Sequence, residues 1–388
     1  MAVRIGLEVL LDEYLHLIRG SRVGLIASAS SVDSQLVSSV ERLYQCKEIR
    51  LVALFGPEHG IRGDVQAGDH VATSVDKVTG LPVYSLYGET RKPTAEMLED
   101  VDALLFDLQD GGVRFYTYLS TLVYAMQASS EFGFRIVILD RPNPITGKIL
   151  EGGILNPNFS SFVGLLPIPL RHGLTAGEVA HYINETFHIN CNLTTIPMKG
   201  WRRSLWFDET GLPFIPPSPN IPTLSTLTVY PGTCLIEGTN LPEGRGTTKP
   251  FEYIGAPWLD AETLATAMNK RQLPGVRFRP VYFTPTFNKY AHQQCAGIHI
   301  YVTDRDKFRP VEMTIHLLSE IIQHYPDKFA FNPPHRAGTH PHFDLLAGSN
   351  KLREHLISGR PISEILSQWE NELEKFSADR APFLLYED

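Results

Sequence analysis

The sequence predicts an α/β protein with a Rossmann-like, doubly wound parallel sheet and a second, smaller α+β domain. In its first part, short continuous apolar runs alternate with helical patterns, which is typical of parallel strands covered by helices on both faces. In its second part, Pro-rich stretches separate a few strand-like and helical runs. The length of 388 residues also exceeds what one hydrophobic core usually supports. We therefore expect a Rossmann-like domain at residues 1–155 and an α+β domain at residues 156–388.

Five apolar runs in the first domain have the length and composition of buried strands. They are Val23–Ala27, Arg50–Phe55, Val83–Leu86, Ala103–Asp107 and Arg135–Leu139. Helical patterns precede or separate them at residues 8–19, 34–43 and 118–132. The first helical pattern stops at Gly20, because glycine readily adopts the left-handed conformation that follows a helix.

The second domain is expected to begin with a capped helix. The spacing of Thr175 and Glu178 is that of a capping box, so we expect Glu178 to cap a helix over residues 179–187 and to have no catalytic role. The run Leu212–Asn220 contains too much proline for a helix or a strand. The remaining predicted elements are strands at Val276–Phe283 and Gly297–Val302 and helices at 260–271, 311–325, 351–358 and 362–376.

The charge of the chain argues against a nucleic-acid or membrane partner. The formal net charge is −8 and no basic run is longer than Trp201-Arg202-Arg203, whereas binding to nucleic acid depends on clustered Lys and Arg. Acidic residues interrupt the apolar stretch at the start of the chain, so this stretch resembles neither a signal peptide nor a membrane span. We expect a soluble, cytoplasmic protein.

No metal or nucleotide cofactor is expected. The four cysteines have no Cys-x-x-Cys spacing, and the spacing of His335, His340 and His342 fits no usual set of metal ligands. The first strand is followed by Ser28-Ala29-Ser30-Ser31 instead of the glycine pattern that lets backbone amides approach a pyrophosphate. The sequence also lacks a phosphate-binding Gly-Lys-Ser/Thr and the Gly-x-Ser-x-Gly elbow of serine hydrolases.

Polar loops directly follow three of the predicted strands. They are Gly56–Gly63, Leu108–Tyr116 and Asp140–Pro144. Because ligands of open parallel sheets bind beyond the carboxyl ends of the strands, we expect these loops to converge on one site. Each loop alone could be a simple turn, since Gly-Pro, Asn-Pro and Asp-Gly are common turn signals. Turns do not require carboxylates, Arg, Gln, His and Tyr together, so the three loops jointly favour a functional site.

The side chains of these loops suit a sugar ligand. Carboxylates can transfer protons, aromatic faces can stack on the ring, and Arg and Asn can bind hydroxyls or an acidic substituent. Glu58 is the expected catalytic acid, with Asp107, Asp110 and then Glu237 as candidates for the second group. A substrate-assisted route through a 2-acetamido group stays open. The expected substrate-binding residues are His59, Arg62, Gln109, Arg114, Tyr116, Arg141, Asn143, Arg171, His172, Glu237, Asn240 and Arg245.

Seven runs in one order, spread over nearly the whole chain, resemble glycoside hydrolase family 171, formerly a domain of unknown function. They are Gly56–Gly63, Asp107–Tyr118, Asp140–Pro144, Pro169–Gly173, Pro217–Asn220, Glu237–Thr247 and Asn288–Gly297. The resemblance implies an exo-β-N-acetylmuramidase that releases terminal N-acetylmuramic acid from the non-reducing end of peptidoglycan fragments in cell-wall recycling. It also implies that the site lies in a cleft between the two domains and that Glu58 is the acid.

Two features depart from the family pattern. The family tends to have Asn-Gln-Thr-Gly after the first strand, where this chain has Ala27-Ser28-Ala29-Ser30, and better-known members carry export signals.

The predicted substrate is a muropeptide or disaccharide fragment, whose lactyl carboxylate we expect Arg171 or Arg114 to bind, with Arg62, Arg141 and Arg245 as reserves. Two alternatives are a non-catalytic muropeptide-binding protein and, disfavoured by the missing glycines, a Rossmann-type oxidoreductase.

Overall fold

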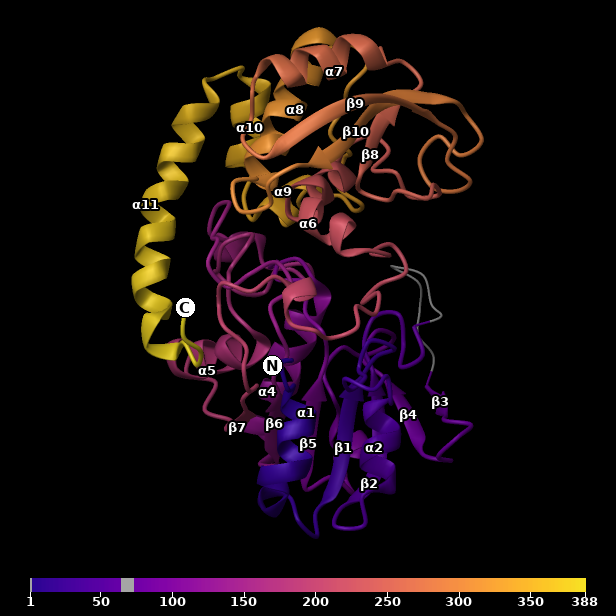
Figure 1. Cartoon of the computed structure of the whole chain (residues 1–388), viewed down its shortest axis with the longest axis vertical. Helices are drawn as coiled ribbons and strands as arrows, with labels where there is room; N and C mark the ends of the chain where they lie inside the picture. The colour runs from indigo at the N-terminus through magenta and orange to yellow at the C-terminus, as the bar shows by residue number, and fades with distance from the viewer. Residues whose placement is uncertain (1, 64–72) are drawn as a thin grey trace.

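The computed structural model describes residues 2–63 and 73–388, which form two lobes (Figure 1). The N-terminal lobe is built on a seven-stranded sheet in the order β3-β4-β2-β1-β5-β6-β7, in which all strand pairs are parallel except β3 with β4. Its strands are β1 (Arg22–Ala27), β2 (Arg50–Gly56), β3 (Ser74–Val75), β4 (Pro82–Ser85), β5 (Ala103–Asp107), β6 (Arg135–Leu139) and β7 (Asn192–Ile196). This confirms the predicted doubly wound α/β fold.

The two faces of this sheet are both buried, because neighbouring residues of each central strand pack into different cores. Leu25 and Leu105 belong to a cluster that packs with the N-terminal helical segment and α2 (Ser39–Gln45). Their neighbours Ile26 and Phe106 belong to a second cluster, which continues through α4 (Thr117–Phe132) and α5 (Ala176–Thr186) into the C-terminal lobe. Continuous apolar runs were therefore the correct signal for these strands.

The sheet extends beyond the domain boundary expected at residue 155. Strand β7 pairs in parallel with β6, so α5 and β7 belong to the N-terminal lobe. The sequence did not predict β7, because this edge strand is only partly buried and has no apolar run. The capping box that precedes α5 is confirmed, since Thr175 and Glu178 bond to each other's backbone amides.

The structure differs from the prediction in the helix expected over residues 8–19 and in the start of the helix that follows it. The first is divided into α1 (Gly6–Val9), a π-helical turn at Leu10–Tyr14 and a 3₁₀ turn at Leu15–Leu17. Helix α2 begins at Ser39 instead of residue 34, because Asp33 accepts hydrogen bonds from the amides of Gln35 and Val37 and holds this segment as a turn.

The C-terminal lobe has a three-stranded antiparallel sheet in the order β8-β10-β9. Exposed and buried residues alternate along β9, as expected for a strand with one face towards solvent. Pro280 is tolerated in β9 because this strand lies at the edge of the sheet. The strands are β8 (Tyr253–Ala256), β9 (Val276–Phe283) and β10 (Cys295–Val302). The helices are α6 (Leu224–Thr233), α7 (Ala261–Lys270), α8 (Pro310–His324), α9 (His342–Ala347), α10 (Lys351–Ile357) and α11 (Ile362–Arg380), while α3 (Ala95–Leu98) lies in the N-terminal lobe.

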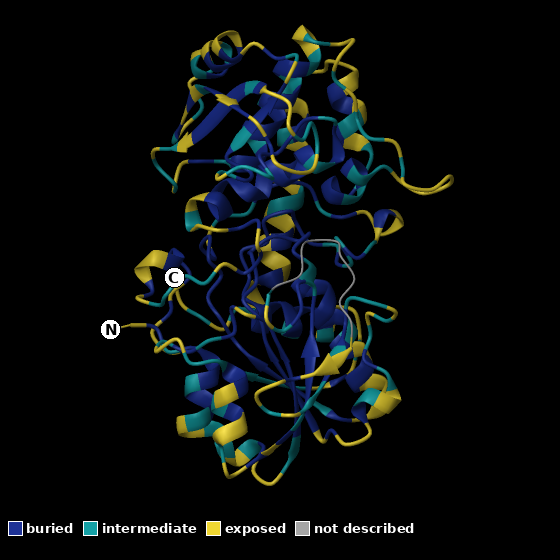
Figure 2. Ribbon diagram, turned by 90° about the vertical axis from the view of Figure 1, so that its right-hand side faces the viewer, coloured by how far each residue is buried: buried dark blue, intermediate teal, exposed yellow. Residues whose placement is uncertain are grey.

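Helix α11 runs from the C-terminal lobe back along the N-terminal lobe, where the chain ends (Figure 1). The tail is held there by hydrogen bonds from Arg380 to the carbonyls of His172 and Gly173 and from the Tyr386 hydroxyl to Asp140, 2.5 Å away. Buried segments occupy the middle of both lobes and their junction (Figure 2). Within residues 2–63 and 73–388, no helix has the length and apolar character that a membrane crossing requires.

Candidate active site

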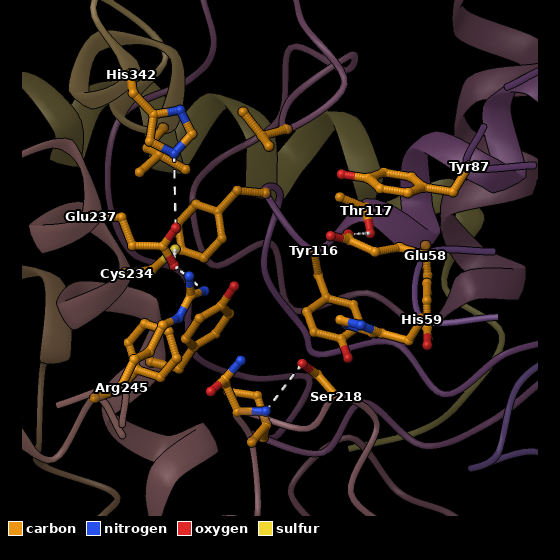
Figure 3. Close-up of a pocket in the computed structure, with 18 residues that line it drawn as sticks. Glu58, His59, Tyr87, Tyr116, Thr117, Ser218, Cys234, Glu237, Arg245 and His342 are labelled. Carbon is orange, nitrogen blue, oxygen red and sulfur yellow. Dashed lines mark hydrogen bonds and ion pairs between the residues drawn. The ribbon is translucent and has the colours of Figure 1, made fainter. Parts of the chain in front are cut away.

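A cavity of about 210 Å³ lies at the junction of the two lobes (Figure 3). Its wall in the N-terminal lobe comes from the turn after β2 and from the loop that leads from β5 into α4. Its opposite wall comes from α6 and the loops that follow it, together with the start of α9. The described residues that line it are Glu58, His59, Tyr87, Phe115, Tyr116, Thr117, Tyr118, Val163, Ser218, Asn220, Ile221, Tyr230, Cys234, Glu237, Arg245, Phe251, His342 and Leu346.

Glu58 lies in a tight turn immediately after β2. His59 and Gly60 both have left-handed backbone angles, with φ of 73° and 72°, which is unusual for two successive residues when one is not glycine. The Thr117 hydroxyl, in the first turn of α4, donates a hydrogen bond of 2.6 Å to Glu58 Oε2. Burial and the nearby Glu58 raise the pKa of Tyr87 to about 12, so Tyr87 stays a neutral phenol that can donate to Glu58.

Glu237 lies on the opposite side of the cavity, in the 3₁₀ turn that extends α6 (Figure 3). Its carboxylate is 2.9 Å from Arg245 Nη2 and 3.8 Å from His342 Nε2, and it accepts a hydrogen bond from the Cys234 thiol. Burial alone would raise the pKa of Glu237, but Arg245, His342 and Lys289 together hold it below its ordinary value. Glu237 is therefore ionised at neutral pH.

Aromatic rings form the cavity surface between the two carboxylates. The Tyr230 ring makes edge-to-face contacts with Phe115, Tyr116 and Phe251, with centroid separations of 5.4, 6.4 and 4.8 Å. The Tyr116 hydroxyl is buried and has no hydrogen-bond partner among the described residues. Burial raises its pKa, so it is a neutral donor that a ligand in the cavity could engage.

The structure brings only part of the predicted site together in this cavity. The predicted residues that line it are Glu58, His59, Tyr116, Glu237 and Arg245. The predicted residues that do not line it are Arg62, Asp107, Gln109, Asp110, Arg114, Arg141, Asn143, Arg171, His172 and Asn240. Most of these are buried and already bonded within the protein.

Asp107 and Arg141 form a buried ion pair at the carboxyl ends of β5 and β6. Arg141 Nε and Nη2 lie 2.6 and 2.9 Å from the two carboxylate oxygens of Asp107, which also accepts a hydrogen bond from Ser39. Asp107 was expected as the preferred partner of the acid; it has no exposed surface and does not line the cavity between the lobes. The pair fills the point between β1 and β5 where a doubly wound sheet usually binds its ligand, and leaves a cavity of only about 20 Å³ there.

Arg114 and Arg171, which were expected to bind substrate, are also buried in the protein interior and do not line the cavity. Arg114 donates to the carbonyl oxygens of Gly153, Ile168 and Leu346, and Arg171 donates to a carbonyl oxygen and lies 3.9 Å from Glu151. Burial lowers the pKa of Arg114 to about 9, because no carboxylate compensates its charge. Both guanidinium groups therefore tie loops together.

The remaining predicted residues hold loops or pair locally. Asp110 accepts a hydrogen bond of 2.7 Å from the amide of Gly112 and lies 3.5 Å from His172. The side-chain amides donate to carbonyl oxygens, Gln109 to that of Pro142, Asn143 to that of Leu174 and Asn240 to that of Lys328. Arg62 pairs with Asp76.

Several lining residues were not predicted. His342 lies in a segment for which the sequence predicts no helix or strand, and only the fold brings it to Glu237. Thr117 could have been found, since it directly follows Tyr116 at the start of a predicted helix. Within the part of the chain that the structure describes, no group of three or more His, Cys, Asp or Glu has an arrangement that could hold a metal ion.

A cavity between two lobes, with one carboxylate on each side and aromatic rings between them, suits an α/β enzyme of the glycosidase type. Comparison with known proteins supports this class. Residues 23–225 match the N-terminal part, and residues 228–386 the C-terminal part, of the family model described as exo-β-N-acetylmuramidase NamZ. These two matches cover nearly the whole chain, and the chain belongs to this family.

Similar proteins agree with the assignment. The chain is 50% identical over 384 residues to the peptidoglycan β-N-acetylmuramidase NamZ of Bacillus subtilis (strain 168). The aligned region covers 99% of this chain and 91% of that protein. Two crystal structures of DUF1343 family proteins from Bacteroides fragilis share the fold. One is 37% identical with a TM-score of 0.93, covering 100% of this chain and 99% of the other. The second is 29% identical with a TM-score of 0.76, and both chains are covered fully.

Proposed function

We propose that this protein is an exo-acting β-N-acetylmuramidase that releases terminal N-acetylmuramic acid from the non-reducing end of muropeptide or disaccharide fragments of peptidoglycan. The proposal is supported by membership in the NamZ family and by the likeness to the Bacillus subtilis enzyme. The structural observation that carries it is the placement of Glu58 and Glu237 on opposite sides of one cavity (Figure 3).

Glu58 is proposed as the catalytic acid. Cleavage breaks the bond between the anomeric carbon and the glycosidic oxygen, and the proton of Glu58 passes to that oxygen as the aglycone leaves. Thr117 fixes one carboxyl oxygen of Glu58 at 2.6 Å and thereby restricts the direction in which the proton is delivered. Water completes the reaction at the anomeric carbon.

Glu237 is proposed as the second carboxylate, in place of Asp107 and Asp110. Its contacts with Arg245 and His342 keep it ionised, which suits a group that stabilises positive charge on the sugar ring or accepts a proton from water. Two carboxylates in different environments suit the usual mechanism of glycoside hydrolysis, in which one carboxyl group gives a proton while the other stays charged.

The proposal is tested by release of a chromophore from an aryl β-N-acetylmuramide, with and without a nicotinamide cofactor. We expect cofactor-independent release by the wild type and a loss of about 10²–10⁴-fold in kcat for Glu58→Gln, which keeps the shape of the side chain but cannot act as an acid. Glu185→Gln, on the exposed face of α5, is the matched control and should retain full activity. A folded Glu58→Gln enzyme with nearly unchanged kcat would refute the assignment of the acid.

A further inference from the structure

Arg245 is distinguished from the other cations of the chain by its position. Among the described residues it is the one Lys or Arg side chain that lines the cavity between the lobes. Burial alone would lower its pKa, but Glu237 and Glu243 raise it above the ordinary value, so the guanidinium is always charged. The cavity therefore presents one permanent positive charge to a ligand.

The guanidinium of Arg245 is held in a fixed orientation. Gly244 and Gly246, with left-handed φ values of 76° and 78°, form the turn that carries Arg245, and the Phe251 ring lies 5.3 Å from the guanidinium carbon. Nη2 donates to Glu237, whereas Nε is buried and has no hydrogen-bond partner among the described residues. A buried donor without a partner is uncommon in a native protein and indicates a place where a ligand can bond.

The neighbouring carboxylates leave Arg245 Nε without a hydrogen bond. Glu243 lies 3.7 Å from Arg245 Nε but is itself bonded to Lys289 and Asn288, each at 3.0 Å. The charges of Glu237, Glu243, Arg245 and Lys289 sum to zero, and His342 adds a positive charge when it is protonated. An anionic group of a ligand could thus approach the Arg245 guanidinium without repulsion from a net negative charge on these four side chains.

We propose that Arg245 binds the carboxylate of the lactyl ether that distinguishes N-acetylmuramic acid from N-acetylglucosamine, and that this contact sets the preference for muramides. The inference rests on the proposed function of the cavity. A planar guanidinium can hold a carboxylate through parallel N–H bonds, which the point charge of Lys cannot reproduce. This assigns the role expected of Arg171 or Arg114 to a residue that, unlike them, faces the cavity.

The experiment compares kcat/KM for aryl β-N-acetylmuramide, its lactyl carboxamide and aryl β-N-acetylglucosaminide. It uses the wild type, Arg245→Lys, Arg245→Gln and the control Arg22→Lys, whose arginine pairs with Asp102 at the far end of β1. We expect the muramide-to-glucosaminide ratio to fall by about 10–100-fold in both Arg245 variants and to stay unchanged in the control. We also expect the wild type, but not Arg245→Gln, to prefer the acid over the carboxamide.

The ratio is measured on one enzyme sample, so it does not depend on the fraction of each variant that is correctly folded. A ratio that stays within about threefold of the wild type in both Arg245 variants, or an equal loss on both substrates, would overturn the inference. If a variant has no measurable turnover, the affinities for free N-acetylmuramic acid and N-acetylglucosamine are compared by calorimetry in the Glu58→Gln background. The Arg245 variants should lose the preference for N-acetylmuramic acid there as well. An unchanged preference would refute the inference. A wild type that cleaves neither glycoside would instead contradict the proposed function.

Discussion

Replacing Asp107 with Asn should destabilise the protein far more than it slows the reaction. Asp107 is fully buried, Arg141 is 6% exposed, and two charge-assisted hydrogen bonds of 2.6 and 2.9 Å join them. The variant would leave the Arg141 guanidinium buried without a counter-charge. Breaking a buried pair in this way typically costs about 3–5 kcal/mol of the free energy of unfolding.

This cost corresponds to a measurable shift in the melting temperature. An unfolding entropy of about 2.1 cal/mol/K per residue gives about 0.8 kcal/mol/K for the whole chain, so the Tm should fall by about 4–6 °C. The measurement is a calorimetric melt of Asp107→Asn beside Asp102→Asn. Asp102 is 45% exposed in its pair with Arg22, and its replacement should cost less than about 1 kcal/mol.

The activity of the same samples decides between a scaffold and a catalytic role for Asp107. At a temperature well below the transition, kcat of Asp107→Asn should stay within about tenfold of the wild type, because Asp107 does not line the cavity. An unchanged Tm together with a loss of kcat of about 10²-fold or more would refute this reasoning and return Asp107 to the catalytic residues.

Three further variants test how the loops around the site are held. Thr175→Ala removes the capping hydrogen bond at the start of α5 and the hydrogen bond from the Thr175 hydroxyl to buried Asp140, and should lower the free energy of unfolding in urea by about 1–3 kcal/mol; an unchanged midpoint would contradict this. Arg114→Met leaves three carbonyl oxygens without their donor and should lower the Tm more than Thr175→Ala does, with an equal or smaller shift counting against the structural role. Burial raises the pKa of Glu151 to about 7 from an ordinary value of 4.5, so the folded state keeps a proton that the unfolded chain has lost between these values. The contribution of Glu151 to stability should therefore fall as the pH rises from about 4.5 to 7, by up to about 1.4 kcal/mol per pH unit, and Glu151→Gln should remove that slope from a series of melts; an identical slope in both proteins would exclude it.

The strands and helices that were predicted accurately share a strong local signal. Strand Ala103–Asp107 has the predicted bounds because a continuous apolar run between polar loops suits a strand buried on both faces. Helix α5 is capped by Thr175 and Glu178 as predicted, although it begins at Ala176 and not at residue 179. By contrast, the partly buried edge strand β7 and helix α6, which contains Pro231, follow from packing against neighbours, and their sequences lack a clear periodic pattern.

The position of a site residue could be predicted from the sequence where the residue closely follows a strand, but the direction of a side chain within a longer loop could not. Glu58 follows β2 directly, so its position at the sheet edge follows from the strand itself. Arg114 and Arg171 are in loops of similar composition, yet their side chains turn into the interior and bond to carbonyl oxygens. A sequence does not show whether a loop arginine meets a cavity or buried carbonyls, because both environments satisfy the same donors.

The sequence by itself determined the doubly wound sheet, the family and the turn that carries Glu58, since each depends on residues close together in the chain. Only the tertiary structure decided which second carboxylate shares the cavity with Glu58. Asp107 lies at the end of β5 in the same sheet but is neutralised by Arg141, whereas Glu237 comes from the other lobe and is joined there by His342 from α9. The reason is physical: burial and charge compensation depend on which distant segments pack together, and these contacts are set by the junction of the two lobes.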